Sequence, residues 1–465
     1  MKEKKIYDAI TDIPDSLIDE AEKTKLKRMH TLRAGFPFNI AASIAACLVL
    51  AAGLIFVIPR FVNNNSNTAN AALYEVVFPK AYAYADYDYG SVVYDNYPVD
   101  DAFLSALDDF SSKTSSQILA DSSGNVNYSP LSMYFALAMA TSGARGETAG
   151  ELLDLLGVSE QATLSEQCGN LYRRLYLDNE IGKLSINNSL WMDKSINWKD
   201  DFVKNAAENF FTHSFSVDFA DGKTGQSMAK WIAEYTNGAQ TPLISIDPEQ
   251  ILTVLNTVSF YDEWYDRFDK EKTAEDKFHL ADSSAVNCDF MNRTYDIYSF
   301  YRGEGFTRSN LAMKNARDMI FILPDENISP RELISTPDKA RDVFSDEFNY
   351  AGEVVWQIPK FEFNSSLDFA DELKSFGVNL AFERDADFSG ITDGMAFLRN
   401  IRQNTRIGID ENGVEASAFT QIDTMGAPLR TGRADMILNR PFLFGIFARN
   451  NTLLFAGICE NPTMG

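Results

Sequence analysis

Helix-like patterns come first along this chain and strand-like patterns come last, and no linker-like segment divides residues 99–465. Apolar residues recur at helical spacing between Asp100 and Leu119, and Leu131 to Thr141 is apolar almost all round, as in a helix buried at a domain centre. Strand-like runs follow at 184–192, 250–261, 318–324, 354–363, 405–410, 441–448 and 452–458. This order predicts one α+β domain over 99–465, with early helices packed on large mixed or antiparallel β-sheets.

Local signals predict where some of these elements begin and end. Thr148 followed by Glu151 has the spacing of a capping box, so we expect a helix to open at Thr148. Gly157 is suited to a left-handed helix end. Asn450 and Asn451 tolerate the positive φ of a hairpin turn between the last two strands.

Charge and composition exclude several classes of function. The chain of 465 residues has 42 Lys and Arg against 66 Asp and Glu, a net charge of −24, and such an acidic surface disfavours binding to nucleic acid. The four cysteines contain no C-x-x-C pair, and we expect them to be buried or free thiols. The three histidines are isolated and no G-x-S-x-G elbow is present, which argues against a metal site, a cofactor or a classical hydrolase.

A charge-free run of 19 residues, Ile40 to Ile58, dominates the N-terminal region. As a helix it just spans a bilayer core of about 30 Å. Basic residues precede the run at Lys23, Lys25, Lys27, Arg28 and Arg33. The positive-inside rule then predicts a single-pass protein of the cell membrane, with a cytoplasmic segment 1–35, an anchor 36–60 and an extracellular remainder.

A cleaved signal peptide is the alternative to this anchor, because Ala69-Asn70-Ala71 has small residues at the right spacing and would leave Ala72 as the mature N-terminus. The apolar run is longer than is usual for a signal peptide, which favours the anchor. Residues 61–98 are polar or rich in Tyr and Asp and lack helical periodicity. They predict a flexible tether between the anchor and the domain.

Short motifs from residue 128 to the C-terminus occur in the order typical of one family. They are Tyr128-Ser129-Pro130-Leu131-Ser132, Gly143-Ala144-Arg145-Gly146-Glu147-Thr148, Asn188-Ser189-Leu190-Trp191, Thr236-Asn237-Gly238, Leu255-Asn256 with Trp264, Phe321-Ile322-Leu323-Pro324, Ile358-Pro359-Lys360-Phe361, Asp387-Phe388-Ser389-Gly390-Ile391, Asn439-Arg440-Pro441-Phe442-Leu443-Phe444 and Phe455-Ala456-Gly457. On these motifs residues 100–465 resemble the serpin family, in a bacterial-type form. The resemblance implies a serpin-like fold with an exposed reactive loop.

The segment after residue 409 resembles the hinge of the serpin reactive loop, formed here by Glu411, Gly413, Val414, Glu415, Ala416, Ser417 and Ala418. Alternate residues of a strand face the same side. Val414, Ala416 and Ala418 would therefore share an inner face without charge, while Glu415 and Ser417 would face solvent. Such a loop is able to enter a sheet as a middle strand, although an ordinary exposed loop remains the alternative.

The resemblance also implies a sheet-opening region formed by Ser129, Pro130, Ser132, Asn256, Trp264 and position 403. Serpins usually carry His ten residues before the hinge glycine, whereas this chain has Gln403. An amide both donates and accepts hydrogen bonds, so we expect Gln403 to retain the network with altered strength.

The bait bond is less well defined than the hinge. Family spacing places it at Ala427–Pro428, but a bond to a proline nitrogen is a poor protease substrate. The alternatives are Met425–Gly426, Gly426–Ala427, Leu429–Arg430 and Arg430–Thr431. Ala427 or Met425 favours an elastase-like or subtilisin-like target, and Arg430 a trypsin-like one.

The resemblance implies a suicide inhibitor of serine or cysteine proteases rather than an enzyme. In this mechanism the cleaved loop inserts into the central sheet and traps the protease as an acyl-enzyme. The alternative is a non-inhibitory serpin fold that acts as a surface or binding protein.

Overall fold

The computed structural model describes residues 73–84, 87–235, 246–399, 401–412 and 430–464, together with residue 244. The predicted cytoplasmic segment 1–35, the predicted anchor 36–60 and most of the predicted reactive loop lie outside these residues. Within the described ranges, no helix combines the length and the apolar character that a membrane crossing requires.

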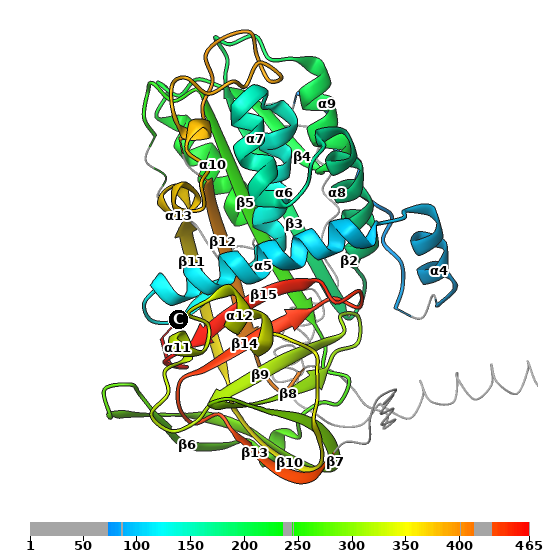
Figure 1. The fold of residues 1–465 in the computed structure, drawn as a ribbon, viewed down its shortest axis with the longest axis vertical. Coiled ribbons are helices and arrows are strands. Elements are labelled where there is room, and N and C mark those ends of the chain that lie inside the picture. The colour runs from blue at the N-terminus through cyan, green and yellow to red at the C-terminus, as the bar shows by residue number, and fades with distance from the viewer. Residues whose placement is uncertain are drawn as a thin grey trace, which may run out of the picture. The chain divides into compact units, whose positions relative to one another are not determined.

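Two β-sheets organise the described residues (Figure 1). The six-stranded sheet has the order β11-β12-β5-β3-β2, with β4 paired to β3. The nine-stranded sheet has the order β1-β15-β14-β9-β8-β7-β10-β13, with β6 paired to β7. The strands are β1 Val126–Tyr128, β2 Leu177–Asp178, β3 Gly182–Asp193, β4 Thr212–Val217, β5 Leu252–Asp262, β6 Ala274–His279, β7 Ala285–Gly303, β8 Phe306–Ala312, β9 Asp318–Pro324, β10 Tyr350–Pro359, β11 Phe361–Asp368, β12 Ile401–Ile409, β13 Arg430–Ile437, β14 Phe442–Phe447 and β15 Leu453–Cys459.

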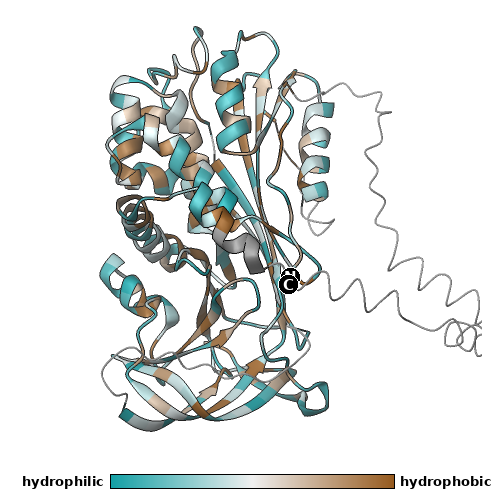
Figure 2. Cartoon of the chain, turned by 90° about the vertical axis from the view of Figure 1, so that its right-hand side faces the viewer, coloured by the Kyte–Doolittle hydropathy of each residue, from teal (hydrophilic) through white to brown (hydrophobic). Residues whose placement is uncertain are grey.

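Helices come mainly from the first half of the described chain, as the sequence pattern predicts. They are α4 Tyr87–Asn96, α5 Asp101–Asp121, α6 Pro130–Gly143, α7 Gly146–Leu156, α8 Gln161–Leu175, α9 Asp200–Asn209, α10 Lys223–Tyr235, α11 Pro330–Leu333, α12 Pro337–Val343 and α13 Ala370–Ser375, with short 3₁₀ turns at Lys270–Lys272 and Leu380–Phe382. Figure 2 shows teal and brown residues alternating along the strands at the bottom of the view, as in a sheet with one solvated face. The predicted α+β class is confirmed.

Helix α6 lies at the centre of the domain. Every residue of α6 except Ser142 is buried, because the helix is apolar on all sides. Pro130 occupies its first turn, where its missing N–H costs nothing, and the Ser129 side chain accepts a hydrogen bond from Ser132 N. α6 packs against α5, α7, α8 and α9 and against β5 and β15, so it joins the helices to both sheets.

The capping box predicted at Thr148 and Glu151 is wrong, because α7 begins earlier, at Gly146. Both side chains form tertiary contacts instead. Thr148 Oγ1 accepts a hydrogen bond from Asp387 N at 2.9 Å, and Glu151 Oε2 accepts one from Asn379 N at 2.7 Å. The left-handed end at Gly157 is confirmed, with φ of 70°.

The run 354–363, read as one strand from the sequence, is two strands in different sheets. β10 ends at Pro359 in the nine-stranded sheet, and β11 begins at Phe361 in the six-stranded sheet. Lys360 is therefore the point at which the chain crosses between the sheets. β7 was not predicted at all, because its exposed, polar residues obscure the period of two.

The segment predicted as a flexible tether, 61–98, is attached to the domain over the part that the structure describes. Residues 87–96 form α4, in which Val93 is buried. Arg174 Nη2 donates a hydrogen bond to Tyr94 O at 3.1 Å, and Asn170 Nδ2 donates one to Pro98 O at 2.9 Å. These tertiary contacts leave no local pattern in the sequence, which explains why the segment reads as a free stalk.

Polar side chains form a row across the middle of the six-stranded sheet. Thr257 on β5 is in register with Asn187 on β3 and Asn404 on β12. All three are buried, yet the Thr257 hydroxyl and the Nδ2 atoms of both asparagines have no hydrogen-bond partner among the described residues. The row shares its face with Leu255, which packs beneath α10. A buried polar atom without a partner costs about 1–3 kcal/mol, so this row destabilises the sheet.

We predict that Thr257→Val raises the free energy of unfolding by about 1 kcal/mol, because valine has nearly the same shape without the unpaired hydroxyl. Thr405→Val is the matched control, since Thr405 is equally buried but donates from Oγ1 to Asn127 O at 2.8 Å. It should lower the free energy of unfolding by about 1–3 kcal/mol. Urea unfolding measures both, and a loss of stability in Thr257→Val would contradict the account.

Candidate functional site

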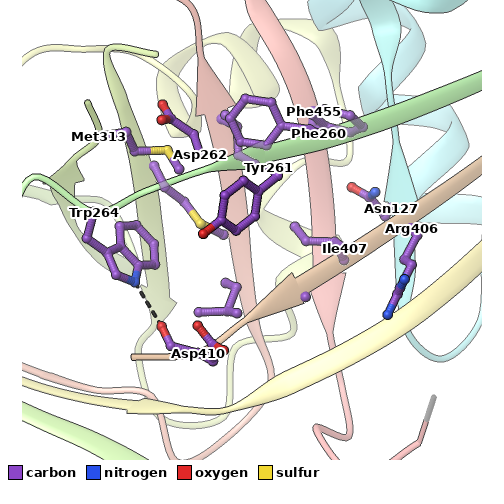
Figure 3. A pocket seen from close by; sticks show the side chains of 14 residues that line it. Asn127, Phe260, Tyr261, Asp262, Trp264, Met313, Arg406, Ile407, Asp410 and Phe455 are labelled. Carbon is purple, nitrogen blue, oxygen red and sulfur yellow. Dashed lines mark hydrogen bonds between the residues drawn. The ribbon is translucent and has the colours of Figure 1, made fainter. Parts of the chain in front are cut away.

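The six-stranded sheet is only partly closed between its two central strands. β5 and β12 run parallel and pair over five positions, from Ile401 with Val254 to Thr405 with Val258. Beyond Thr405 the two strands continue without pairing to each other in the described chain. A cavity of about 60 Å³ lies there, lined by both strands and by Trp264 and Met313 (Figure 3). The sheet is therefore open at the end where the chain leaves β12 for the predicted hinge.

Trp264 holds the start of the hinge at this opening. Its side chain is buried, and Nε1 donates a hydrogen bond to Asp410 O at 3.0 Å, the dashed line in Figure 3. The Asp410 carboxylate in turn accepts from Asn412 N at 2.8 Å and forms a local turn. The predicted site residue Trp264 thus lies directly beside the predicted hinge.

Glu411 is fixed by two donors. It is 5% exposed, and its carboxylate accepts a hydrogen bond from Thr273 Oγ1 at 2.7 Å and forms an ion pair with Lys360 Nζ at 3.1 Å. Burial opposes ionisation, but these donors outweigh it and lower the pKa of Glu411. Lys360 is the residue between β10 and β11, so the hinge is attached to the point where the chain changes sheets.

A second carboxylate, Asp262, lines the opening at the end of β5. It accepts hydrogen bonds from Ala316 N at 2.7 Å and from Asn315 Nδ2 at 2.8 Å. Burial nevertheless raises the pKa of Asp262, because desolvation outweighs these donors. The residue fixes the end of β5 to the 315–316 turn.

The other predicted sheet-opening residues meet beneath α6. Gln403 Oε1 accepts from Ser129 N at 2.9 Å, and Gln403 Nε2 donates to Ser129 O at 3.0 Å. Ser132 Oγ donates to Asn256 Oδ1 at 2.5 Å, and Asn256 Nδ2 donates to Asn188 Oδ1 at 2.8 Å. The Gln403 amide therefore both donates to and accepts from the backbone of Ser129. Gln403 is next to Asn256 as its register partner on the neighbouring strand β5.

The structure thus separates the predicted sheet-opening residues into two groups along the boundary between β5 and β12. Ser129, Pro130, Ser132, Asn256 and Gln403 lie where β5 and β12 are paired, and Trp264 lies where they part. Thr273 and Lys360 were not predicted as site residues. Lys360 occurs in the motif at 358–361, but nothing in the sequence indicates that it faces Glu411.

Most of the predicted loop lies outside the described residues, namely Gly413, Val414, Glu415, Ala416, Ser417 and Ala418 of the hinge and Met425, Gly426, Ala427, Pro428 and Leu429 of the bait region. Arg430 is described and opens β13. It is in parallel register with Tyr350, and its N–H donates to Asn349 O at 3.2 Å. The candidate bond Arg430–Thr431 therefore lies inside a paired strand.

The arrangement of the described residues suits a change of conformation. They contain no group of three His, Cys, Asp or Glu side chains that could hold a metal ion. Cys168, Cys288 and Cys459 are free, and burial raises the pKa of Cys288 to about 11, so its thiolate is disfavoured at neutral pH. The distinctive features are instead a partly open sheet and a chain segment fixed at its mouth.

Comparison with known proteins matches residues 105–462 to the family model described as serpin (serine protease inhibitor). An uncharacterized serpin-like protein of Thermococcus kodakarensis is 30% identical over 366 residues, which covers 75% of this chain and 83% of that protein. Among solved structures, the thermophilic serpin Tengpin in the native state has a TM-score of 0.70 at 27% identity, covering 85% of this chain and all of that one.

A structure of thyroxine-binding globulin in complex with thyroxine has a TM-score of 0.65 at 23% identity, covering 77% of this chain and 99% of that one, which shows the fold alone. The relatives include proteins of Thermococcus kodakarensis and of mammals, so the bacterial-type form stays a prediction. The family model spans most of the chain, and its residues include the open sheet and the hinge described above. The chain belongs to the serpin family.

Proposed function

We propose that this serpin is a membrane-tethered, extracellular suicide inhibitor of serine or cysteine proteases. Serpins are typically protease inhibitors rather than catalysts. The observation that carries the proposal is the parallel pair β5 and β12, which is unpaired at the end nearest the hinge. The chain leaves β12 at this end, so a loop that folds back between the strands would run antiparallel to both.

Insertion would replace one short parallel ladder by two antiparallel ladders. Each new backbone hydrogen bond contributes about 0.5–1.5 kcal/mol net, and the uncharged inner face of Val414, Ala416 and Ala418 would be buried as well. The flanking pairs β11 with β12 and β3 with β5 are already antiparallel, so the widened sheet would keep its pattern. These gains supply the free energy that trapping a protease requires.

The chemical step belongs to the protease. Its serine or cysteine attacks the bait carbonyl, the peptide bond breaks, the new amino terminus leaves with a proton, and an acyl-enzyme forms. Loop insertion before water can attack would carry the attached protease away from the bait position and preserve the ester or thioester. The inhibitor is consumed because its own bait bond has been cut.

The bait bond is proposed to lie before Pro428. Arg430 is paired in β13 and its N–H is bonded to Asn349 O, and a protease needs its substrate bond free of a sheet ladder, which disfavours both Leu429–Arg430 and Arg430–Thr431. Met425–Gly426 and Gly426–Ala427 avoid the proline nitrogen of the bond expected from family spacing. Small or apolar residues at these bonds favour an elastase-like or subtilisin-like target over a trypsin-like one.

A non-inhibitory serpin is the second candidate. Thyroxine-binding globulin, which has this fold, is named for a ligand and not for a protease. The two candidates differ in whether the loop inserts after cleavage. A complex with protease that survives boiling in detergent supports inhibition, whereas cleavage without such a complex supports a binding or surface role.

We predict that Val414→Arg or Ala416→Arg converts the inhibitor into a substrate. Either arginine would carry an unpaired charge into the closed sheet, at a cost of about 3–5 kcal/mol, while leaving the bait bond intact. Incubation with an elastase or subtilisin and gel electrophoresis should show cleavage at the parental bond without a trapped complex. Glu415→Arg, at a solvent-facing position of the same hinge, is the control and should trap protease like the parent. Equal trapping by all variants would rule out insertion.

We also predict that protease treatment of intact cells releases the serpin domain, because residues 36–60 are proposed to anchor it with residues 61–465 outside. The released fragment should begin between residues 61 and 72, ahead of the packed segment. Mass spectrometry of the released and the retained fragments gives the boundary. A full-length chain recovered from the cytosol, or a chain that begins at Ala72 in the medium of untreated cells, would contradict the anchor.

A further inference from the structure

Residues 73–84, which we call the strap, precede the part matched by the family model and lie along the outer edge of the six-stranded sheet. β4 pairs with β3 on one side. On its other side Leu73 N donates a hydrogen bond to Ser214 O at 2.7 Å. Tyr74 reaches α9 through a hydrogen bond from its hydroxyl to Glu208 Oε1 at 3.3 Å. The strap therefore satisfies one backbone carbonyl, Ser214 O, on the edge of β4.

Phe78 anchors the strap in an aromatic pocket on the domain. Its ring centroid lies 6.4 Å from that of Tyr176, 6.1 Å from that of Phe211 and 5.8 Å from that of His213. Phe211 has φ of 51°, a left-handed conformation that is uncommon for a non-glycine residue. It stacks on Tyr172 with the centroids 4.1 Å apart. The domain thus holds a strained aromatic residue in the place where it forms one wall of the Phe78 pocket.

His213 links the strap to α10. The imidazole contacts Phe78 on the strap and Phe215 on β4, and its Nε2 lies 3.3 Å from the hydroxyl of Tyr235 on α10. Nδ1 is buried and has no hydrogen-bond partner in the part of the chain that the structure describes. Within the described chain the ring makes no ion pair. Charged residues on the elements around it include Glu75 and Lys80 on the strap, Arg173 on α8, Glu208 on α9, and Lys230 and Glu234 on α10, and the Arg173 guanidinium lies 5.1 Å from the centre of the Phe211 ring. A charge on this ring would therefore be buried among aromatic groups without a carboxylate in contact.

We propose that the pocket of Tyr176, Phe211 and His213 is a docking site for the Phe78 strap, and that protonation of His213 releases the strap in mildly acidic solution. The occupant is the chain's own segment, whose hydrogen bonds and ring contacts are given above. Release of the strap does not depend on protease inhibition. Residues 73–84 act as a detachable clamp on the edge of the six-stranded sheet.

The direction of the pH effect follows from burial. Desolvation lowers the pKa of His213 to about 4, whereas a solvated histidine titrates near 6.5. The released state binds the proton more tightly, so docking is fully favoured above about pH 6.5 and weakens as the pH falls toward 4. At pH 5 the docking equilibrium should be weaker than at neutral pH by up to about 30-fold.

Amide hydrogen exchange of the full chain tests the docking, with mass spectrometry of peptides covering 73–84 at about pH 7.5 and pH 5. Variants are compared with the parent at the same pH, so the intrinsic pH dependence of exchange cancels. His213→Gln should keep the strap protected at pH 5, by up to about 30-fold over the parent. His213→Phe, which keeps a ring without a titratable nitrogen, should do the same.

His279→Gln is the matched control, because His279 is exposed on β6 and should leave strap exchange unchanged. Phe78→Ala should remove strap protection at both pH values while the strands of the sheet stay protected. Equal protection of the parent and both His213 variants at pH 5 would overturn the acid release. Parental protection in Phe78→Ala would overturn the docking site itself.

Discussion

The parallel pairing of β5 and β12 is the constraint on which the rest of the structure depends. A parallel pair needs a long crossover between its strands, and here the chain between them forms much of the nine-stranded sheet. The pair is closed by the ladder from Ile401 to Thr405, where Gln403 also bonds the Ser129 backbone, and it is open beside Trp264. The same arrangement leaves the exit of β12 at the open end, where Glu411 is held by Lys360 and Thr273.

In the paired part of β5 and β12, several buried polar side chains have incomplete hydrogen bonding among the described residues. Thr257, Asn187 and Asn404 lie in register across the three central strands and are buried, each with a polar atom that has no partner in the described ranges. A partly satisfied polar network is less stable than an apolar core of the same shape. A strand inserted between β5 and β12 would separate Thr257 from Asn404 and give each a new neighbour. The native sheet is therefore destabilised at the position where the loop is proposed to insert, and insertion there would relieve part of this cost.

Much of the fold was predictable from local pattern, because α6, Gly157 and the strands β3, β5, β9, β14 and β15 carry strong signals of their own. The cap of α7 and the division of 354–363 at Lys360 were not, since both depend on partners far away in the sequence. The candidate site shows the same limit. Gln403 and Trp264 were identified by their place in family motifs, but the pairing of Lys360 with Glu411 and the packing of Phe78 exist only in the folded chain.

The central claim is that the native sheet gains stability when the loop becomes one of its strands. The most direct test is to cut the loop between residues 424 and 429 with a protease that is not trapped, and to compare the thermal unfolding of cut and intact protein. The cut protein should unfold at a clearly higher temperature, because the loop would become a paired central strand. An equal or lower unfolding temperature would contradict this claim.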